Sequence, residues 1–521
     1  MPYQSHHIPL SETGSFSRLI LDYIDQKKNL QPFYTFQPEI SSFKQAMKDR
    51  TAIPLNRELL VDVLKKQYAA VPSAEPSLNK IHQLSESGTF TVCTGHQLCL
   101  FTGPLYFIYK ILSVINLSEA LKKQYPENNF VPVYWMASED HDFEEISTIN
   151  LFGKKIKWET DKQGGPVGRM DPLSIEPVLD EYKTLLGDSA FAIELDSLFR
   201  DAYLKHSTLA EATRFLVHSL FGKYGLVILD GDDPSLKEEF KELIIDDIRN
   251  QTNFSLVNES SKALKQEGYD IQVNPREINV FRMTSVERRR IENSSEEILN
   301  LPVQEFSPNV VLRPLYQQRI LPNLAYVGGP GELAYWLEYK AMFDHHRILF
   351  PVLIPRNFAM IVDQKSAKQL AKLGMNFTEL FSETDELIKR FINNNSSGST
   401  SLTEEADLMK AMFEGICKKA VQVDPTLKAN AEAELQKSLQ GLKNIETKLL
   451  RAEKQKQEHA INQIKKLKEK FFPENILQER YENFSPYYLS SGSLFIEEMK
   501  GLLKPFDFSM QIIVEKSPEN N

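Results

Sequence analysis

The chain has 521 residues, of which 41% are hydrophobic and 25% are charged, and its formal net charge at pH 7 is -10. A chain of this length exceeds a single hydrophobic core, so we expect two or three domains. The acidic balance argues against a nucleic-acid partner, which would normally require a basic surface on the protein.

The three cysteines, Cys93, Cys99 and Cys417, form neither a CxxC motif nor a zinc-site spacing. This argues against a disulfide scaffold and a structural metal, and it indicates a reducing compartment. The N-terminus lacks the basic and apolar regions of a signal peptide, and no run reaches the roughly 18 apolar residues of a membrane span. We therefore expect a cytoplasmic protein without a membrane partner.

Apolar spacing and turn residues predict alternating strands and helices up to about residue 360. The first predicted elements are helices over 15–25 and 57–66, a strand over 89–94, a helix ending near 125 and a strand over 130–137. A hairpin over 149–158, helices within 177–220, a strand over 225–229 and a helix over 235–250 follow. The last elements of this part are two strands around Pro275-Arg276, strands over 310–314 and 325–327, a helix over 333–343 and a last strand over 350–356. A strand, a turn and a helix follow one another three times. This repetition predicts an α/β fold with a doubly wound sheet.

The turn Thr94-Gly95-His96-Gln97 follows the first of these core strands. We expect a helix to begin there, interrupted by Phe101-Thr102-Gly103-Pro104. Such a helix start would point backbone N–H groups at phosphate or carboxylate oxygens. The sequence therefore predicts that His96 and Gln97 contact a phosphate or an acyl group, and a histidine that only caps the helix is the alternative.

The strand over 130–137 ends in a dense group of titratable side chains, Glu139, Asp140, His141, Asp142 and Glu144. Ligands of open α/β sheets bind at this end of the strands. A substrate site for an amino group, ribose hydroxyls or a magnesium nucleotide fits this group best. A solvated acidic loop is the alternative, and no HxH or HxxxH spacing supports a protein-bound metal.

Three further strand ends carry candidate ligand-binding residues. Gly328-Gly329-Pro330-Gly331-Glu332 is a glycine-rich turn without the pattern of a dinucleotide or Walker loop. The aromatic residues around this turn favour a role in lining a ligand-binding site, and a turn needed only for packing is the alternative. Asp230 follows another strand and suits ribose hydroxyls or a helix cap. Arg313 and Arg356, each at a predicted strand end, suit a carboxylate or phosphate, and surface arginines without a role are the alternative.

Beyond Ser366 the pattern predicts only helices. A polar loop is expected over 393–400, and one helix from Asp424-Pro425 to about Lys470. Leucines and other apolar residues recur in this helix at heptad spacing with one stutter, which predicts a coiled coil that dimerises or braces the protein. The tail from Tyr487 to Val514 is apolar enough to fold back on a core.

Three long motifs in this chain resemble the bacillithiol biosynthesis cysteine-adding enzymes, the BshC family of cysteine ligases. They are Thr94-Gly95-His96-Gln97 with Leu100 to Tyr106 and Tyr109-Lys110, then Pro132 to Phe143, then Ala325 to Trp336. The resemblance covers the whole chain. It implies a Rossmann-type nucleotide-binding core with connecting insertions, similar to class I aminoacyl-tRNA synthetases, and an α-helical coiled coil that forms a homodimer.

The resemblance also implies the reaction, in which cysteine is joined to glucosaminyl-malate to form bacillithiol with ATP, and Mg²⁺ accompanies the nucleotide. The synthetase signature His-x-Gly-His falls on Cys93-Thr94-Gly95-His96, so its first histidine is absent. The second signature has only a loose counterpart in Lys365-Ser366-Ala367-Lys368, which also suits a plain helix start. Two alternatives stay open: a ligase or nucleotidyltransferase of the same fold that acts on another acid and amine, and a non-catalytic nucleotide-binding scaffold.

These inferences define the expected domains and site. The domains are a core over 1–375 with insertions near 150–220 and 255–305, a coiled-coil domain over 376–475, and a C-terminal segment over 476–521 that packs on the core. The expected catalytic residues are His96, Gln97, Asp140, His141 and Asp142. The expected substrate- or nucleotide-binding residues are Thr94, Gly95, Gly103, Tyr106, Trp135, Glu139, Asp230, Arg313, Tyr326, Gly328, Gly329, Gly331, Glu332, Tyr335 and Arg356.

Overall fold

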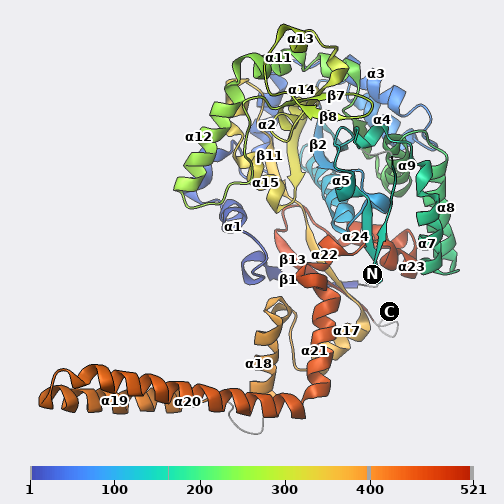
Figure 1. The fold of residues 1–521 in the computed structure, drawn as a ribbon. Coiled ribbons are helices and arrows are strands. Elements are labelled where there is room, and N and C mark those ends of the chain that lie inside the picture. Colours follow the sequence, from blue (N-terminus) through green and yellow to red (C-terminus); the bar gives the residue numbers. More distant parts are fainter. Residues whose placement is uncertain (1–2, 162–163, 396–400, 517–521) are drawn as a thin grey trace. The chain divides into compact units, whose positions relative to one another are not determined.

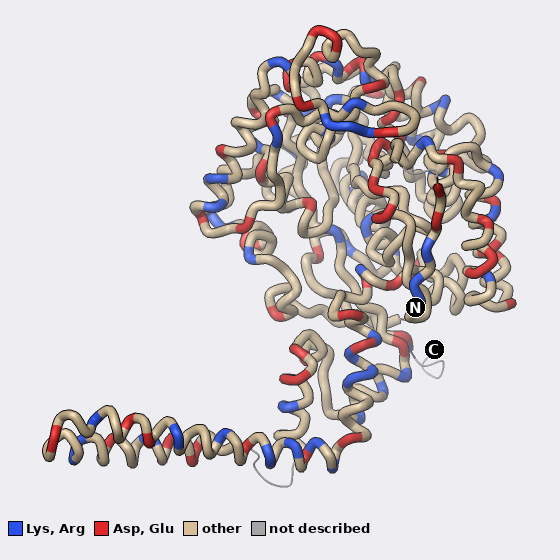
Figure 2. The backbone as a smooth tube through the Cα atoms, viewed as in Figure 1, with Lys and Arg blue, Asp and Glu red and all other residues tan. Residues whose placement is uncertain are grey.

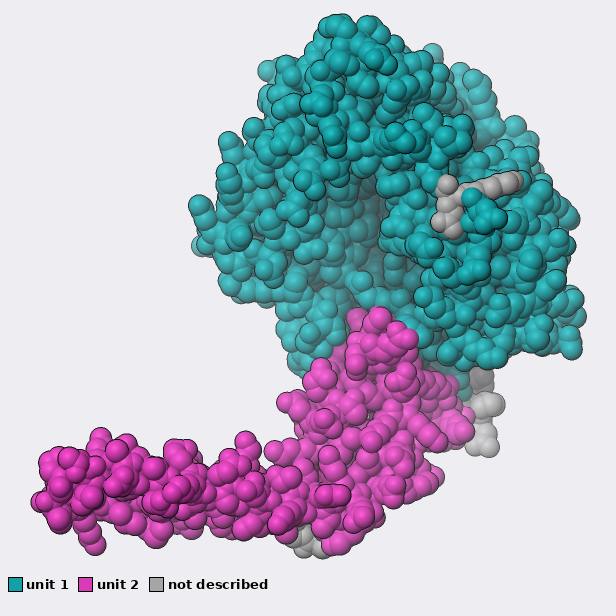
Figure 3. Space-filling view, in the orientation of Figure 1, with its two compact units in different colours: residues 1–361, 478–521 teal, residues 362–477 magenta. Residues whose placement is uncertain are grey.

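The computed structural model describes residues 3–161, 164–395 and 401–516. The chain forms two compact units, which Figure 3 shows in different colours. Unit 1 comprises Met1–Ile361 and Gln478–Asn521, and unit 2 comprises Val362–Leu477. Within the described part of the chain, none of the helices has the length and apolarity that crossing a membrane requires.

Unit 1 is built around a five-stranded parallel sheet with the strand order β11-β10-β2-β3-β6 (Figure 1). The strands are β2 (Thr89–His96), β3 (Asn129–Met136), β6 (Val227–Asp230), β10 (Asn323–Gly328) and β11 (Val352–Pro355). From β2 the chain first extends the sheet through β3 to β6, and then returns to the other side of β2 with β10 and β11. The order therefore reverses between β2 and β10, and the predicted doubly wound sheet is confirmed.

Helices cover both faces of this sheet, which explains why its strands are apolar along their length rather than alternating. Every residue of β2 is buried, and α5 (Tyr106–Gln124), which connects β2 to β3, is buried around most of its circumference. At the reversal point the Thr94 hydroxyl donates a hydrogen bond of 2.7 Å to the backbone oxygen of Val327. This bond ties β2 to β10 where the two halves of the sheet meet.

The segment after β2 differs from the prediction. Gly95 and His96 belong to β2 and pair with β3, and the helix begins only at Tyr106. The backbone first turns through a 3-10 segment, Leu100–Thr102, and Gly103 has φ 72°. A Cβ atom at Gly103 would lie 2.7 Å from the Cβ of Cys99, so this glycine serves the turn. The expected helix N-terminus beside His96 and Gln97 is therefore wrong.

The segment over 310–314 is not a strand, because Asn309 starts a helix there. Its side-chain oxygen accepts hydrogen bonds from the backbone N–H groups of Val311 and Leu312, and α14 (Arg313–Ile320) follows. Arg313 therefore lies at the beginning of a helix and not at a strand end. The helix expected over 235–250 is split into α10 (Pro234–Glu238) and α11 (Lys241–Asn250).

Two insertions extend unit 1. The predicted hairpin and helices are confirmed in the first, which contains β4 (Thr148–Leu151), β5 (Lys154–Lys157), α7 (Glu176–Leu186), α8 (Ala190–Leu204) and α9 (Leu209–Phe221). In the second, the hairpin lies after the expected place and consists of β7 (Val280–Met283) and β8 (Arg288–Arg290), with β9 (Phe306–Pro308) on the other side of β7. The three consecutive arginines of β8 give it a concentrated positive charge (Figure 2).

The chain holds strands beyond the one predicted as the last. β12 (Phe358–Val362) follows β11, and the tail contributes β13 (Ser509–Glu515), which pairs antiparallel with β1 (Tyr3–Pro9) in a second sheet of order β1-β13-β12. The expectation of only helices beyond Ser366 is therefore wrong. The tail from Gln478 belongs to the same compact unit as the parallel sheet.

The remaining helices of unit 1 pack around these sheets. They are α1 (Arg18–Ile24), α2 (Ser42–Thr51), α3 (Arg57–Gln67), α4 (Glu75–Gln83), α6 (Phe143–Ile146), α12 (Thr252–Gln266), α13 (Glu296–Leu299), α15 (Pro330–Leu337), α16 (Lys340–His345), α22 (Gln478–Tyr481), α23 (Ser485–Ser491) and α24 (Leu494–Leu502). Among them, α15 and α16 connect β10 to β11.

Unit 2 is helical and consists of α17 (Gln364–Lys372), α18 (Thr384–Asn395), α19 (Thr403–Val423), α20 (Leu427–Lys456) and α21 (Glu458–Phe471). The long helix expected up to Lys470 is interrupted at Gln457, between α20 and α21. α19 and α20 lie side by side as a helical hairpin (Figure 1). Of the loop expected over 393–400, residues 393–395 end α18 and 396–400 lie outside the described residues.

Candidate active site

A cavity of about 730 Å³ opens at the carboxyl ends of β2, β3 and β10, where the strand order of the sheet reverses. Open α/β sheets bind their ligands at this place. Figure 3 shows unit 1 hollowed on the face turned to the reader. The predicted site residues that line the cavity are Gly95, His96, Gln97, Tyr106, Trp135, Glu139, Asp140, Arg313, Tyr326, Gly329, Gly331, Glu332, Tyr335 and Arg356.

The other predicted residues, Thr94, Gly103, His141, Asp142, Asp230 and Gly328, do not line the cavity. Several of them have a structural partner instead. The Asp142 carboxylate accepts a hydrogen bond of 3.2 Å from the backbone N–H of Glu145 and caps α6. The Asp230 carboxylate accepts hydrogen bonds from the Ser138 hydroxyl and from the backbone N–H of Asp232. The structure therefore separates the predicted residues that line the cavity from those that lie outside it.

His96 contributes a neutral imidazole to the cavity wall. Its ring is 8% exposed and packs against the rings of Tyr106 and Phe107, with centroids 5.5 Å and 4.9 Å away. Burial, followed by the nearby charge of Lys110, lowers the pKa of His96 to about 3. Its Nε2 atom is buried and has no partner among the described residues. This nitrogen is therefore available to hydrogen-bond a ligand.

Lys110 is a cavity residue that the sequence analysis did not select. Its ammonium is 2% exposed and lies 2.6 Å from both the backbone oxygen of Gly95 and the carboxylate Oε2 of Glu332. The sequence signal that could have identified Lys110 is its position as a single lysine within an otherwise apolar stretch of α5, because a buried lysine requires a partner. That partner is distant in sequence, so spacing alone does not identify it.

Glu332 joins four elements at the cavity floor. Besides the ion pair with Lys110, its carboxylate accepts hydrogen bonds from the Tyr326 hydroxyl at 2.6 Å and from the backbone N–H of Gly329 at 2.8 Å. Burial alone would raise the pKa of Glu332, but Lys110 and these hydrogen bonds outweigh it and lower the pKa. The carboxylate is therefore ionised and links β10 and α15 to β2 and α5.

The Gln97 side chain is hydrogen-bonded to two carboxylates. Its amide nitrogen donates hydrogen bonds to Asp140 at 3.1 Å and to Glu145 at 2.6 Å. Burial would raise the pKa of Asp140, but the hydrogen bond from Gln97 and the charge of Arg288 lower it. Asp140 therefore faces the cavity as a carboxylate, and Gln97 positions it.

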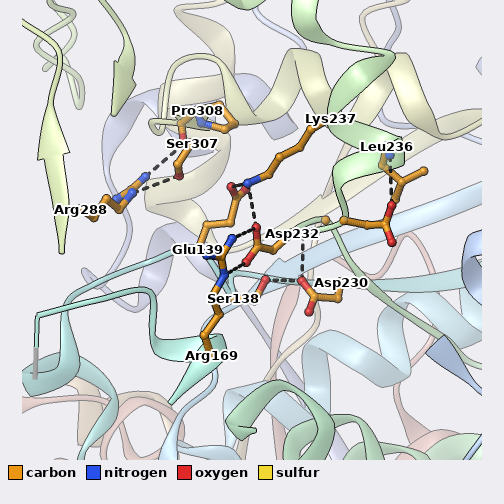
Figure 4. Close-up of polar contacts among 12 residues, drawn as sticks. Ser138, Glu139, Arg169, Asp230, Asp232, Leu236, Lys237, Arg288, Ser307 and Pro308 are labelled. Atoms are coloured by element: carbon orange, nitrogen blue, oxygen red, sulfur yellow. Dashed lines mark hydrogen bonds and ion pairs between the residues drawn. The ribbon is translucent and has the colours of Figure 1, made fainter. Parts of the chain in front are cut away.

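Behind Glu139 lies a buried charge network (Figure 4). The Lys237 ammonium, 1% exposed, lies 2.6 Å from Glu139 and 2.7 Å from Asp232. Arg169 binds the same Asp232 through two hydrogen bonds of 2.6 Å and 2.9 Å. Burial would lower the pKa of Lys237, but the carboxylates of Glu139 and Asp232 outweigh it and raise the pKa. The network fixes Glu139 at the cavity wall, where burial raises the pKa of its carboxyl group although the charge of Lys237 lowers it.

Arginines give the cavity a positive rim. Arg288 is held in place by hydrogen bonds of 3.1 Å to the Ser307 hydroxyl and the Pro308 backbone oxygen, and it stacks at 4.1 Å over the ring of Phe281. Three more exposed arginines also line the cavity, namely Arg276, Arg290 and Arg480. They suit the oxygens of an anionic ligand. None of these four arginines is among the site residues predicted from the sequence.

Arg356 lines the cavity, but its guanidinium group is already paired with the carboxylate of Glu479. It forms hydrogen bonds of 2.6 Å and 3.1 Å with Glu479, and both side chains are 1% exposed. Its guanidinium also lies 4.9 Å from the centre of the Tyr106 ring. Arg356 therefore holds α22 of the tail against the core, and this contact explains why the tail closes this part of unit 1.

Two family descriptions match the chain in succession. Residues 3–357 match "Bacillithiol biosynthesis BshC, N-terminal Rossmann-like domain", and residues 359–515 match "Bacillithiol biosynthesis BshC, C-terminal coiled-coil domain". The chain belongs to the BshC family. The expected family, the Rossmann-like core and the coiled-coil domain are confirmed. The Lys365-Ser366-Ala367-Lys368 segment lies at the start of α17 in unit 2, where Asp363 caps the helix.

Members of the BshC family resemble this chain over nearly its whole length. A protein of Flavobacterium psychrophilum named "Putative cysteine ligase BshC" is 44% identical over 97% of this chain and 98% of its own. Proteins with the same name from Flavobacterium johnsoniae and Cytophaga hutchinsonii are 41% and 39% identical, each over 97% of this chain and over 99% and 98% of their own lengths.

No group of three or more histidine, cysteine, aspartate or glutamate side chains placed to hold a metal ion occurs among residues 3–161, 164–395 and 401–516.

The Lys110–Glu332 pair predicts a specific pattern of stability. Lys110→Met leaves the Glu332 carboxylate, which is 25% exposed, without its counter-ion, so we expect the free energy of unfolding to fall by about 3 kcal/mol, the lower end of the range for a fully buried pair. The double substitution Lys110→Met with Glu332→Gln removes that charge and should recover part of the loss, as measured by denaturant unfolding. Lys123→Met, on the exposed face of the same helix, is the control and should change stability by less than about 0.5 kcal/mol. Equal losses in Lys110→Met and Lys123→Met would contradict this role.

The low pKa of His96 predicts a pH dependence of stability. The unfolded chain binds a proton at this imidazole below pH 6.5, whereas the folded protein does so only near pH 3. The stabilising contribution of the neutral ring is therefore complete above pH 6.5 and is lost as the pH falls from 6.5 towards 3. Between pH 7.5 and pH 5, we expect the free energy of unfolding to fall by about 2 kcal/mol more in the wild type than in His96→Gln. Parallel curves for the two proteins would show that His96 titrates normally.

Proposed function

We propose that this protein is an ATP-dependent ligase that joins cysteine to glucosaminyl-malate to form bacillithiol, the last step of bacillithiol biosynthesis. The observation that carries the proposal is the cavity at the sheet reversal. It combines a neutral histidine with a free nitrogen, ionised carboxylates fixed on one wall and a rim of arginines. The names of the relatives support the reaction class.

The charges of the cavity match the proposed substrates. ATP and the malate group carry phosphate and carboxylate oxygens, which Arg276, Arg290 and Arg480 suit. The amine of glucosaminyl-malate and the amino group of cysteine suit Glu139 and Asp140, because ionised carboxylates accept several hydrogen bonds. The cavity of about 730 Å³ admits a nucleotide together with a small acid.

Amide formation from a free carboxylate is unfavourable, so the acid must first be activated. In the proposed reaction, the cysteine carboxylate attacks a phosphorus atom of ATP and releases pyrophosphate or ADP. The amine of glucosaminyl-malate then attacks the acyl carbon, loses a proton and displaces AMP or phosphate. His96 would donate a hydrogen bond to a phosphate oxygen during activation, and Asp140 would accept the proton of the amine. The remaining residues position the reactants.

The direct test combines purified protein with ATP, cysteine and glucosaminyl-malate, and detects bacillithiol by mass spectrometry. We expect ATP-dependent formation of the product, and the phosphorus product identifies the activated intermediate. His96→Ala should lower kcat by about 100-fold or more, because it removes a hydrogen bond to developing charge. His82→Ala, on the exposed surface of α4, is the matched control and should be fully active.

Two outcomes of this test would contradict the proposal. Turnover with a different amino acid or amine, but none with cysteine and glucosaminyl-malate, would indicate a ligase or nucleotidyltransferase with other substrates. Absence of turnover with every acid and amine, combined with ATP binding in a thermal-shift measurement, would indicate a non-catalytic scaffold. The absent first histidine of the synthetase signature, replaced by Cys93, favours this scaffold over the other alternative.

We propose further that the protein is a homodimer that associates through the α19–α20 hairpin of unit 2. Leu408, Met412 and Ile416 recur every four residues on α19 and are 72%, 56% and 41% exposed, and Ile445 on α20 is 51% exposed. An apolar stripe of this kind on a helical hairpin is typical of a surface that a second copy covers.

The dimer is tested by sedimentation equilibrium. We expect a dimer for the wild type and a monomer for the double substitution Leu408→Lys with Met412→Lys, because two charges in the stripe would be buried unpaired. Lys410→Gln, on the same helix outside the stripe, is the control and should stay dimeric. A monomeric wild type, or a dimer that survives the double substitution, would contradict the proposed interface.

A cytoplasmic location is also proposed. Its support is that Cys93, Cys99 and Cys417 are all free thiols, as expected in a reducing compartment. Recovery of the protein in the periplasmic fraction of cells would contradict this location.

A further inference from the structure

A second cavity, of about 270 Å³, lies at the other end of the parallel sheet of unit 1. One of its walls is the end of α14, which leads into β10, and another is the segment 346–349, which leads into β11. Because β10 and β11 are parallel, both segments lie at the amino ends of the strands. The candidate active site lies at the carboxyl ends, and the two cavities share no lining residue.

The lining of this second cavity has three arginines against two carboxylates, an excess of one positive charge. Arg50, Arg319 and Arg347 line it, together with Glu242 and Asp246. Arg50 is 3% exposed, and two of its nitrogens donate to backbone oxygens at 2.9 Å and 3.2 Å rather than to a carboxylate. Burial, followed by the like charges of Arg57 and Arg319, lowers the pKa of Arg50 to about 10. A negative charge in the cavity would relieve this repulsion.

Two buried side chains of the same cavity have polar atoms without a protein partner. Both amide atoms of Gln318, which is 2% exposed, and the Nε atom of Arg50 are buried and unpartnered within the described part of the chain. Each such atom costs about 1–3 kcal/mol unless something else bonds it. Since both side chains line the cavity, a molecule inside the cavity is the available partner.

We propose that this cavity binds a small oxyanion, with the chemistry of inorganic phosphate or a short carboxylate, through Arg50, Gln318 and Arg319. The anion accepts hydrogen bonds from the guanidinium groups and from the Gln318 amide, and its charge neutralises the clustered arginines. The volume suits a small anion rather than a whole nucleotide. The proposal does not depend on the ligase reaction, because it concerns a different cavity.

Amide hydrogen exchange, read peptide by peptide in the mass spectrometer, tests this site in the full-length protein. Phosphate, sulfate and acetate are each exchanged for chloride at constant ionic strength. We expect at least one of them to slow exchange in the segments 317–321 and 346–350 of the wild type. The slowing should reach about tenfold when the anion is present at about ten times its dissociation constant. The most protective anion identifies the class of ligand.

Two variants remove the proposed contacts in different ways. The double substitution Arg319→Gln with Arg347→Asn removes two charges, and asparagine tolerates the φ of 53° at Arg347. Gln318→Glu keeps the shape of the side chain and repels an anion. Both variants should lose the protection, whereas Arg249→Gln, on the exposed surface of α11, should keep it. Unaltered exchange in chloride confirms that each variant is folded.

Two results would overturn the proposal. One is an unchanged exchange rate in these segments of the wild type with all three anions, which would mean that water alone fills the cavity. The other is equal protection in the wild type and in both variants, which would place the bound anion elsewhere on the protein.

Discussion

The partly buried ion pair between Lys110 and Glu332 is the interaction on which the rest of the candidate active site depends. It lies at the one place where the strand order of the sheet reverses, so it joins the two halves of the fold across the cavity floor. Its positive partner also contributes to the low pKa of His96, and its negative partner binds the N–H of Gly329. The pair therefore fixes the shape of this corner, whereas burial is the main cause of the low pKa of His96.

The other charges of the cavity divide into fixed and available groups. Lys237, Gln97 and Glu479 hold Glu139, Asp140 and Arg356, respectively, in one place. The exposed arginines at the rim and the free nitrogen of His96 remain available for a ligand. A site of this kind is organised before its substrates arrive, so little reorganisation is needed during the reaction. Hydrogen bonds and neighbouring cations lower the pKa of Asp140 and of Glu332, whereas burial raises the pKa of Glu139.

Sequence patterns predicted the parts of the fold that depend on local signals. The five parallel strands are apolar runs that end in polar turns, and their order along the chain indicated the doubly wound sheet. The three motifs also placed most of the predicted site residues around one cavity. The helix after β2 was expected too early, because the left-handed residues near Gly103 delay its start and their conformation is not visible in an apolar pattern. The strand expected over 310–314 is absent for a similar reason, since the turn that the Asn309 side chain forms with Val311 and Leu312 leads into α14 and outweighs the β-propensity of two valines.

The cavity residues that were not predicted can be recognised only from contacts between residues that are distant in the sequence. Lys110 meets a glutamate 222 positions away, and Lys237 meets Glu139 from a separate helix. Arg276, Arg288 and Arg290 belong to an insertion, and residue spacing does not reveal that this insertion lies over the sheet.

The most direct test of the account is a crystal structure of the protein with a non-hydrolysable ATP analogue and glucosaminyl-malate. We predict that both ligands occupy the cavity at the sheet reversal, with a phosphate oxygen in hydrogen-bond distance of His96 and the sugar amine beside Asp140. Ligands bound on any other surface, with this cavity empty, would contradict it.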